Sequence, residues 1–523
     1  MATDSPHEST DWLAAENVLL DGVPQIPIGE LAERLAFAPF EKLDREHLSN
    51  ETRMEYLEMT RLPYEPTKQG VTAAAKVLAM LRGGLIARNP LVVENRRARM
   101  KLLAAEACNA TTVPKITSAS FAVRVWTGMT GVGKSALRSR VLSLLPQVIE
   151  RGPCPNLWER LSQLVYLQIS LLDGTKGGFL ESILTGMDDA LGTSYAVDLP
   201  KRHRTVDRLL VGVIGRMHHH YLGLLVIEEA QWRNLIGSPR AAEMQVFLLS
   251  VMNSGIPVLI IGNPSAFSWM EDFTQDARRL HERGWEFFHP IGSMDEKSAV
   301  DDQKAVSYGV TSYYVLKDLP RDLSGCRAFL EDNLGGIVGH ELTLWCNAQE
   351  SAITEGKSSI GPEDLEVELR AERFASNRRV VDAFKARQSW ELRLMKDVPW
   401  EVYATAWKQM PKVNSDPREQ GASAPASLGA SASDSPEPTV AESTSAAELE
   451  ARIAALGKKE RQRFAANQTR ASNRAVKRSA LQESLQSGDM RLDGLQQHAI
   501  EGIANMFKEI DSTKKRKGKV AGK

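Results

Sequence analysis

The motif Gly128-Met-Thr-Gly-Val-Gly-Lys-Ser135 constrains the fold of this chain more than any other feature. It matches the pattern G-x-x-x-x-G-K-[ST], which requires a strand directly before it and a helix directly after it. The β-branched run at residues 121–126 predicts the strand, and residues 134–145 predict the helix. The motif and its two flanks together predict a phosphate-binding loop.

The chemistry of such a loop follows from its residue types. Glycines allow backbone N–H groups to close around an anion, and the helix N-terminus adds its dipole. Lys134 would reach the β- and γ-phosphates of ATP, and the Ser135 hydroxyl would bind Mg²⁺. We therefore predict ATP and Mg²⁺ as cofactors, with the nucleotide held by Gly128, Met129, Thr130, Gly131, Val132, Gly133, Lys134, Ser135 and Ala136.

A second motif lies at residues 222–229, where four apolar residues precede Glu228 and Glu229. This is a Walker B arrangement, in which the first acid binds the metal and the second polarises the attacking water. The first acid is usually Asp, whereas Glu228 carries one more methylene, and Mg²⁺ demands near-ideal octahedral geometry. We predict that Glu228 binds the metal through water, that Glu229 is the catalytic base, and that hydrolysis is slow.

A third motif is the apolar run at residues 258–261, which leads to Asn263. In this order along the chain, Asn263 has the position of a sensor residue that orients the attacking water. Arg278 and Arg279 follow on a predicted helix at residues 272–283. Such an arginine can stabilise transition-state charge on a neighbouring subunit's nucleotide, or it can belong to a solvated helix face, and both interpretations remain open.

Short apolar runs alternate with helical patterns from residue 118 to residue 316. Runs of this kind predict the strands of a parallel sheet built from βαβ units, and they lie at residues 121–126, 164–169, 222–227 and 258–261. Helices are predicted at residues 50–59, at 72–81 with an end at Gly83 and Gly84, at 96–107, and over most of 321–410 with breaks at 335–336 and 361–362. The predicted fold class is therefore α/β.

The composition changes sharply after residue 413. Residues 414–446 consist mainly of Ala, Ser, Pro, Gly and acidic residues, which bury too little apolar surface to fold. Residues 451–523 contain 17 Lys/Arg against 7 Asp/Glu, although the whole chain has a net charge of -1. We predict a disordered linker at 413–446 and a basic helical tail at 447–523 on an otherwise acidic body.

Other features exclude several classes of protein. The four cysteines are isolated and show neither metal-ligand nor disulfide spacing. The polar N-terminus is not a signal peptide, and the apolar stretches are too short to span a bilayer, so we predict a cytoplasmic protein with no membrane partner. The triplet His218-His219-His220 is predicted to lie on the surface, because consecutive side chains point in different directions and rarely converge on one ion.

With these motifs established, the chain resembles the TnsC-type AAA+ regulators of heteromeric transposases. The resemblance includes the Walker motifs, which would fit any AAA+ protein, and it extends to stretches outside them. These stretches are residues 82–90 (RGGLIARNP), 145–149 (LPQVI), 165–167 (VYL), 255–262 (GIPVLIIG) and 277–279 (ARR).

The resemblance implies a P-loop AAA+ core at 81–305, a helical lid at 306–412 and a partner-binding N-terminal extension at 1–80. It implies an ATPase that assembles as a homo-oligomeric ring or filament on double-stranded DNA. Such proteins receive a signal from a target-selection protein (TnsD/TniQ-like) and recruit transposase subunits (TnsA/TnsB-like). Two departures from the family pattern bear on the hydrolysis rate: Glu228 replaces the usual Asp, and Gly336-Ile-Val-Gly-His340 occupies the stretch expected to carry a sensor 2 arginine.

The DNA contacts and the tail leave alternatives open. Initiator-like AAA+ proteins insert a DNA-facing helix after the second strand, where this chain has Lys176, Lys201, Arg202 and Arg204. Ordinary surface charge is the simpler explanation for any one of these residues. The tail could bind transposase, bind flanking DNA, or serve as a solvated arm. Alternative functions are a nucleotide-stabilised scaffold that hardly hydrolyses ATP, and a helicase loader or STAND-type ATPase.

Overall fold

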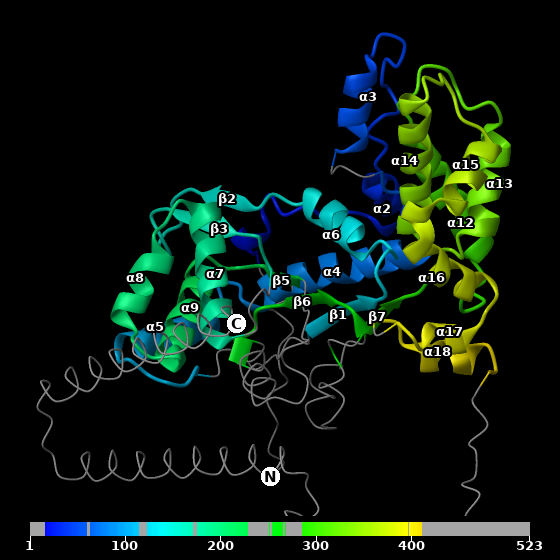
Figure 1. Ribbon diagram of the computed structural model, residues 1–523. Coiled ribbons are helices and arrows are strands. Elements are labelled where there is room, and N and C mark those ends of the chain that lie inside the picture. The colour runs from blue at the N-terminus through cyan, green and yellow to red at the C-terminus, as the bar shows by residue number, and fades with distance from the viewer. Residues whose placement is uncertain are drawn as a thin grey trace, which may run out of the picture. The chain divides into compact units, whose positions relative to one another are not determined.

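The computed structural model divides the chain into two units, Met1–Asn414 and Ser415–Lys523. It describes residues 16–59, 63–114, 123–170, 175–228, 250–251, 254–264, 267, 285–395 and 397–409 (Figure 1). The predicted linker at 413–446 and the predicted tail at 447–523 lie outside the described residues.

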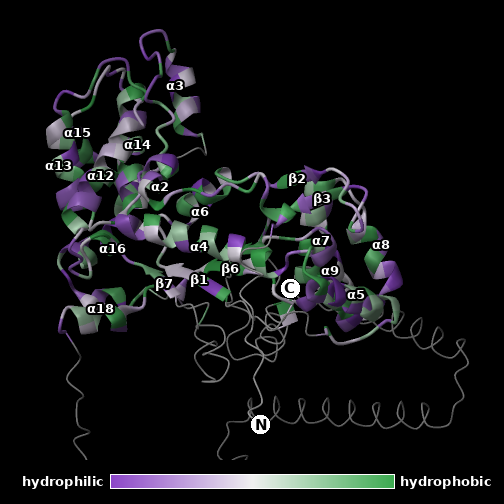
Figure 2. Cartoon of the chain, turned by 180° about the vertical axis from the view of Figure 1, so that it is seen from behind, coloured by the Kyte–Doolittle hydropathy of each residue, from purple (hydrophilic) through white to green (hydrophobic). Residues whose placement is uncertain are grey.

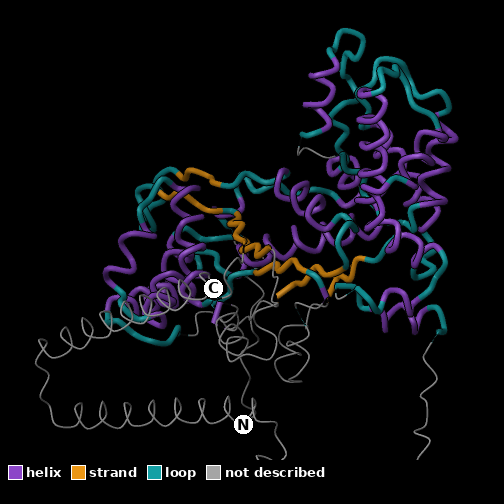
Figure 3. The backbone as a smooth tube through the Cα atoms, in the orientation of Figure 1, coloured by secondary structure: helices purple, strands orange, loops and turns teal. Residues whose placement is uncertain are grey.

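A five-stranded parallel sheet lies at the centre of the first unit, with strand order β4-β5-β6-β1-β7. Every pair of neighbouring strands is parallel. The strands are β1 (Val123–Gly128), β4 (Tyr166–Ser170), β5 (Leu224–Glu228), β6 (Val258–Gly262) and β7 (Trp285–Phe288). β1 is buried along its whole length, as expected for a parallel strand covered on both faces. In Figure 3 the strands follow one another through this unit with helices on either side.

The sheet confirms the predicted βαβ pattern and corrects its details. The apolar run predicted as one strand at 164–169 is divided: β3 (Leu161–Leu164) pairs antiparallel with β2 (Val148–Arg151), and β4 begins two residues later. Strands β2, β3 and β7 were not predicted from the sequence. β7 has a half-exposed pattern with only Phe288 buried, so it does not show the continuous apolar run that marks the other strands.

Alternate residues of each strand enter two different cores. Leu225 and Ile227 of β5 pack with α5 (Val93–Ala107), α7 (Lys176–Leu191), α8 (Tyr195–Arg202) and α9 (Val206–His219). Leu224 and Val226 face the opposite side, where α4 (Lys68–Ala87), α6 (Lys134–Ser143), α2 (Ile28–Leu35) and the 3₁₀ helix η1 (Val18–Leu20) pack. This alternation follows from the two-residue period of a strand. α5 covers the edge of its layer, since Leu102 is its only buried residue and Figure 2 shows it as largely hydrophilic.

Helix α4 is longer than the sequence predicted. The predicted end at Gly83 and Gly84 is wrong, because the helix continues through both glycines to Ala87. A Cβ at Gly84 would lie 2.3 Å from the Cγ of Pro257, so this glycine permits close packing rather than ending the helix. Among the described residues, α4 is the one helix whose length and apolar composition would suffice for a membrane span, and half of that stretch is buried within the fold.

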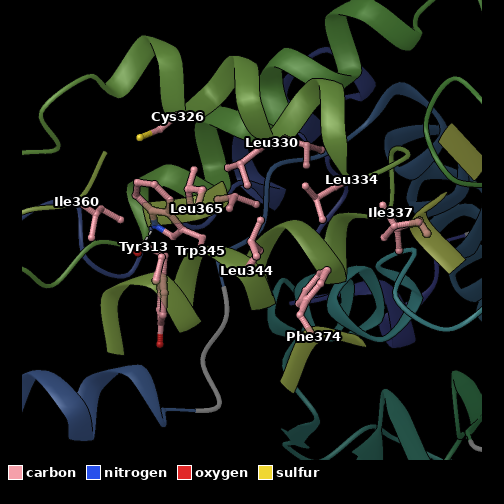
Figure 4. Close-up of a cluster of buried hydrophobic side chains, with 14 of the residues drawn as sticks. Tyr313, Cys326, Leu330, Leu334, Ile337, Leu344, Trp345, Ile360, Leu365 and Phe374 are labelled. Atoms are coloured by element: carbon pink, nitrogen blue, oxygen red, sulfur yellow. Dashed lines mark hydrogen bonds between the residues drawn. The ribbon is translucent and has the colours of Figure 1, made fainter. Parts of the chain in front are cut away.

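The helices after the sheet form a third core. They are α12 (Ala299–Ser312), α13 (Leu323–Asn333), α14 (Val338–Thr354), α15 (Pro362–Arg370), the 3₁₀ helix η5 (Glu372–Phe374), α16 (Ala375–Lys385), α17 (Ser389–Leu392) and α18 (Trp400–Ala406). Trp345 lies inside this core and donates from Nε1 to the Tyr313 carbonyl at 2.8 Å (Figure 4). The predicted breaks at 335–336 and 361–362 are confirmed, since α13 ends before the first and α15 begins at the second.

The N-terminal segment packs on both regions. Leu19, Leu31 and Leu35 belong to the core shared by α4, α6 and the sheet. Phe40 and Leu57, the latter on α3 (Asn50–Leu57), belong to the core of the later helices. The buried Arg53 of α3 donates from its guanidinium to the Val315 carbonyl, which also joins this segment to the later helices.

His218 and His220 at the end of α9 are buried and His219 is half-buried, so the predicted surface location of the triplet is wrong. His218 is 3% exposed and His220 is 7% exposed. Burial lowers the pKa of His218 to about 3 and that of His219 to about 4, which keeps both rings neutral. His220 bonds the Ser162 carbonyl (2.8 Å) and the Tyr195 hydroxyl (2.9 Å). No group of three metal-ligating side chains occurs among the described residues. His218 and His220 are therefore packed residues at the end of α9.

Glu341 on α14 makes the stability of the protein depend on pH. It is fully buried, it accepts from Gln303 at 2.7 Å, and its Oε2 has no hydrogen-bond partner among the described residues. Burial raises the pKa of Glu341 to about 8, with the Glu331 charge adding to the increase. The folded protein therefore binds a proton that the unfolded chain releases near pH 4.5, and this contribution is lost as pH rises through 8.

We expect Glu341→Gln to remove this dependence. Between pH 6 and pH 8 the free energy of unfolding of the unaltered protein should fall relative to the variant by about 2 kcal/mol, as measured by urea titration. The control is Glu366→Gln, an exposed acid on α15. Parallel pH profiles for Glu341→Gln and the unaltered protein would contradict this assignment.

Candidate nucleotide-binding site

A cavity of about 540 Å³ lies at the carboxyl ends of β1, β5 and β6. The phosphate-binding loop lines it with Thr130, Gly131, Val132, Gly133, Lys134, Ser135 and Ala136. The N-terminal segment contributes Pro63, Tyr64, Glu65, Thr67 and Gly70, and the later helices contribute Val306, Gly309, Val310, Val338, Gly339 and Leu342. Three parts of the chain that are distant in sequence therefore enclose one cavity.

Gly128 and Met129 were also predicted to hold the nucleotide, and they lie where the chain leaves β1 and enters the loop. Gly128 has φ +150°, and a Cβ there would lie 2.3 Å from the Phe288 carbonyl oxygen, so the turn out of β1 requires glycine. Met129 is buried. Neither residue is among those that line the cavity, whereas the other seven predicted loop residues are.

Lys134 is held inside the loop. Its Nζ donates to the Gly128 carbonyl at 2.6 Å and to the Met129 carbonyl at 2.7 Å. The side chain is buried, and burial lowers the pKa of Lys134 to about 8, with the Asp397 carboxylate acting in the opposite direction. Asp397 also lies 3.4 Å from the Thr130 hydroxyl, so the segment between α17 and α18 reaches the loop.

Glu228 lies at the end of β5 and lines the same cavity as Ser135. Its carboxylate forms an ion pair with Arg138 of α6 and accepts from Gln168 Nε2 at 2.7 Å. A hydroxyl and a carboxylate on one cavity are the oxygen donors that Mg²⁺ prefers, and the remaining positions can be filled by water and phosphate oxygens. The donor set therefore fits the predicted cofactor.

Asn263 follows β6 and also lines the cavity, next to Ile261 and Gly262. The structure thus brings seven of the predicted loop residues, the predicted metal ligand Glu228 and the predicted sensor residue Asn263 to one cavity. The predicted base Glu229 and the predicted arginines Arg278 and Arg279 lie outside the described residues.

The start of α14 contacts the loop directly. The Gly339 N–H donates to the Gly131 carbonyl at 2.8 Å, and a Cβ on Gly339 would lie 2.9 Å from the Gly131 Cα. This is the stretch in which the sequence shows no sensor 2 arginine. Within the described residues that line the cavity, the helices after the sheet supply only apolar residues and glycine.

Several lining residues were missed from the sequence. Arg138 lies one helical turn after Lys134, a spacing that puts both side chains on one face of α6, so this position could have been found. No sequence motif marks Tyr64 and Glu65 as lining residues. Tyr64 forms an antiparallel bridge with Phe37, and a pairing between such distant residues cannot be predicted from a local pattern. Burial raises the pKa of Glu65.

The four candidate DNA-contacting residues lie near the starts of α7 and α9. Lys176 pairs with Asp207 at 3.3 Å, which ties the start of α7 to the start of α9. Lys201 pairs with Asp198 at 3.7 Å on α8, while Arg202 and Arg204 are exposed. Acidic partners therefore offset part of the positive charge, and Arg202 and Arg204 carry the more accessible part.

One family model and several solved structures are similar to this chain. Residues 122–270 match the AAA domain family. The fold is similar to the Aeropyrum pernix ORC2 protein in its ADP form (14% identity, 68% of this chain and 84% of that chain, TM-score 0.36). It is also similar to Cdc6p from Pyrobaculum aerophilum (13%, 69% and 86%, 0.38) and to domain III of the Thermotoga maritima replication initiation protein DnaA (14%, 53% and 92%, 0.27). No curated protein sequence matches the chain.

The predicted α/β fold class is confirmed, because a parallel sheet flanked by helices carries the loop between β1 and α6. The helices after the sheet occupy the region predicted as the lid, residues 306–412, and we use that name for them.

Proposed function

We propose that this protein is a DNA-associated AAA+ ATPase that binds ATP and Mg²⁺ in the cavity between the sheet and the lid. The observation that carries the proposal is the convergence of Lys134, Ser135, Glu228 and Asn263 on one cavity from three strand ends. A phosphate group entering the loop would replace the Gly128 and Met129 carbonyls as the partner of Lys134. Loop N–H groups would then surround the phosphates.

The roles of the remaining residues follow from their positions. Mg²⁺, held by Ser135 and Glu228, would neutralise phosphate charge. Asn263 would orient the attacking water, and Glu229 would accept its proton. An arginine of a neighbouring subunit, Arg278 or Arg279, would stabilise the charge of the transition state, which requires a homo-oligomer.

We further propose that the protein assembles on double-stranded DNA and links a TnsD/TniQ-like target-selection protein to TnsA/TnsB-like transposase subunits. The support is the resemblance of residues 80–292 to TnsC-type regulators, which extends beyond the nucleotide motifs. The exposed Arg202 and Arg204 supply positive charge for DNA phosphates.

An assembly assay tests this function. The full chain with a non-hydrolysable ATP analogue should cosediment with duplex DNA of unrelated sequences. Affinity should fall at least about tenfold between 50 and 200 mM salt, because phosphate contacts release counterions. Assembly that needs no nucleotide, or a footprint confined to one sequence without a partner protein, would count against the proposal.

A second candidate is an ATP-bound scaffold that hardly turns over. It is favoured by Glu228, which replaces the usual Asp and is already paired with Arg138. Steady-state phosphate release in the presence of DNA separates the two functions, since a scaffold would assemble with DNA and release almost no phosphate.

The tail is proposed to recruit transposase or flanking DNA. Deleting residues 414–523 should leave ATP binding and assembly nearly unchanged, because none of the nucleotide motifs lies in that part of the sequence. Recruitment of transposase in a pull-down should fall. Loss of ATP binding would show instead that the tail belongs to the folded unit, and normal recruitment would exclude a tethering role.

A further inference from the structure

Arg138 places a fixed positive charge on the predicted metal ligand. It lies on α6, one turn after Lys134, and its Nη1 pairs with Glu228 Oε2 inside the cavity. The two side chains are only 15% and 12% exposed, so solvent screens the pair weakly. Gln168 donates to the same oxygen. The guanidinium therefore pairs with the carboxylate that is predicted to bind the metal ion.

We propose that Arg138 is a positioning residue that supplies Glu228 with a resident cation and thereby reduces the dependence of nucleotide binding on Mg²⁺. The inference rests on the proposed function, since it assumes that this cavity binds ATP. It goes beyond that function by assigning a role to a residue that none of the nucleotide motifs contains.

The electrostatic reason is direct. A carboxylate buried beside a triphosphate repels it unless a cation lies between the two, and the metal ordinarily supplies that cation. With Arg138 paired to Glu228, part of this repulsion is removed before any metal binds. Mg²⁺ must also compete with the guanidinium for the carboxylate, which weakens the gain from adding the metal.

The length of the Glu228 side chain also favours this role. Glu at position 228 extends the carboxylate one methylene further from β5 than Asp would, which favours contact with α6.

The test is the Mg²⁺ dependence of ATP binding by the full chain without DNA. Calorimetric titration with ATP is carried out in Mg²⁺ and in EDTA, and the ratio of the two dissociation constants is the metal dependence. For the unaltered protein we expect a ratio below about 10, and for Arg138→Gln a ratio at least about tenfold larger, corresponding to one close charge pair. Arg138→Lys, which keeps the charge, should lie between them, and Arg370→Gln on the lid surface is the matched control.

A double-mutant cycle shows whether Arg138 acts through Glu228 or directly on the phosphates. In a Glu228→Gln background, Arg138→Gln should no longer change the ratio, because no carboxylate charge remains to be neutralised. If the ratio still rises there, Arg138 acts on the phosphates directly and the positioning role is wrong. Equal ratios for Arg138→Gln and the unaltered protein also overturn it.

Two controls keep this result interpretable. Should Arg138→Gln fail to fold, Glu228→Asp withdraws the carboxylate from Arg138 and should raise the ratio, and an unchanged ratio would overturn the proposal. If the unaltered protein binds no ATP in either condition, or if Lys134→Ala binds it normally, the proposed function of the cavity fails instead.

Discussion

Lys134→Ala should lower the affinity for ATP by about 100-fold or more, since a hydrogen bond to a charged group contributes about 1.5–3 kcal/mol and this ammonium can make several. Lys134 is the cation at the centre of the loop, where it already donates to the Gly128 and Met129 carbonyls. Its removal leaves the phosphates without this charge and the two carbonyls without their donor. Nucleotide-dependent assembly on DNA should be lost with binding.

Calorimetric or fluorescent-nucleotide titration measures this effect, with Lys42→Ala, an exposed lysine in the N-terminal segment, as the control. The pKa of Lys134, about 8, adds a pH test. Phosphates favour the charged amine, so ATP affinity should decrease as pH rises above 8, and Lys134→Ala should lack this decrease. Unchanged affinity in Lys134→Ala would refute the assignment of the loop.

Glu229→Gln should lower the turnover number by about 100-fold or more, the range in which a general base contributes, while ATP binding persists. TnsC-type regulators, which the chain resembles, disassemble on hydrolysis, so the variant is expected to leave persistent assemblies on DNA. Glu228→Asp should preserve or raise turnover, because it restores the usual geometry of the metal ligand. The Glu228 carboxylate is engaged by Arg138 and Gln168, which favours Glu229 as the base.

Phosphate release at saturating ATP and DNA measures turnover, and equilibrium titration of each variant shows that the nucleotide still binds. Equal losses of turnover in Glu228→Asp and Glu229→Gln would show that the division of roles between the two carboxylates is wrong.

The sequence predicted those parts of the fold that depend on local patterns. β5 and β6 are continuous apolar runs, and Gly128 belongs to the local pattern of the phosphate-binding loop, so both are visible without tertiary information. The course of α4 through Gly84 could not be predicted, because the reason for that glycine is Pro257, a residue far away in the sequence. The buried histidines illustrate the same limit, since their partners Ser162 and Tyr195 come from other elements.

The residues of the site likewise comprise some that local patterns predict and others that only tertiary contacts bring to the cavity. Lys134, Ser135, Glu228 and Asn263 follow strands in a fixed order, and parallel strands bring their carboxyl ends to one edge. Gly339 and Glu65 reach the cavity from the lid and the N-terminal segment, which no spacing rule connects to the loop. For Arg138, the position on the face of α6 that carries Lys134 could be predicted from the spacing, but the pairing with Glu228 could not.

The N-terminal segment has a consequence for how the protein unfolds. Its first part completes the core on the α4 side of the sheet, and its second part completes the core of the lid. A version of the chain that began at β1 would therefore leave two separate apolar surfaces open to water. The smallest piece able to fold alone must begin before Leu19, and the sheet and lid should lose their structure in one cooperative transition, because neither is complete without the same stretch of chain.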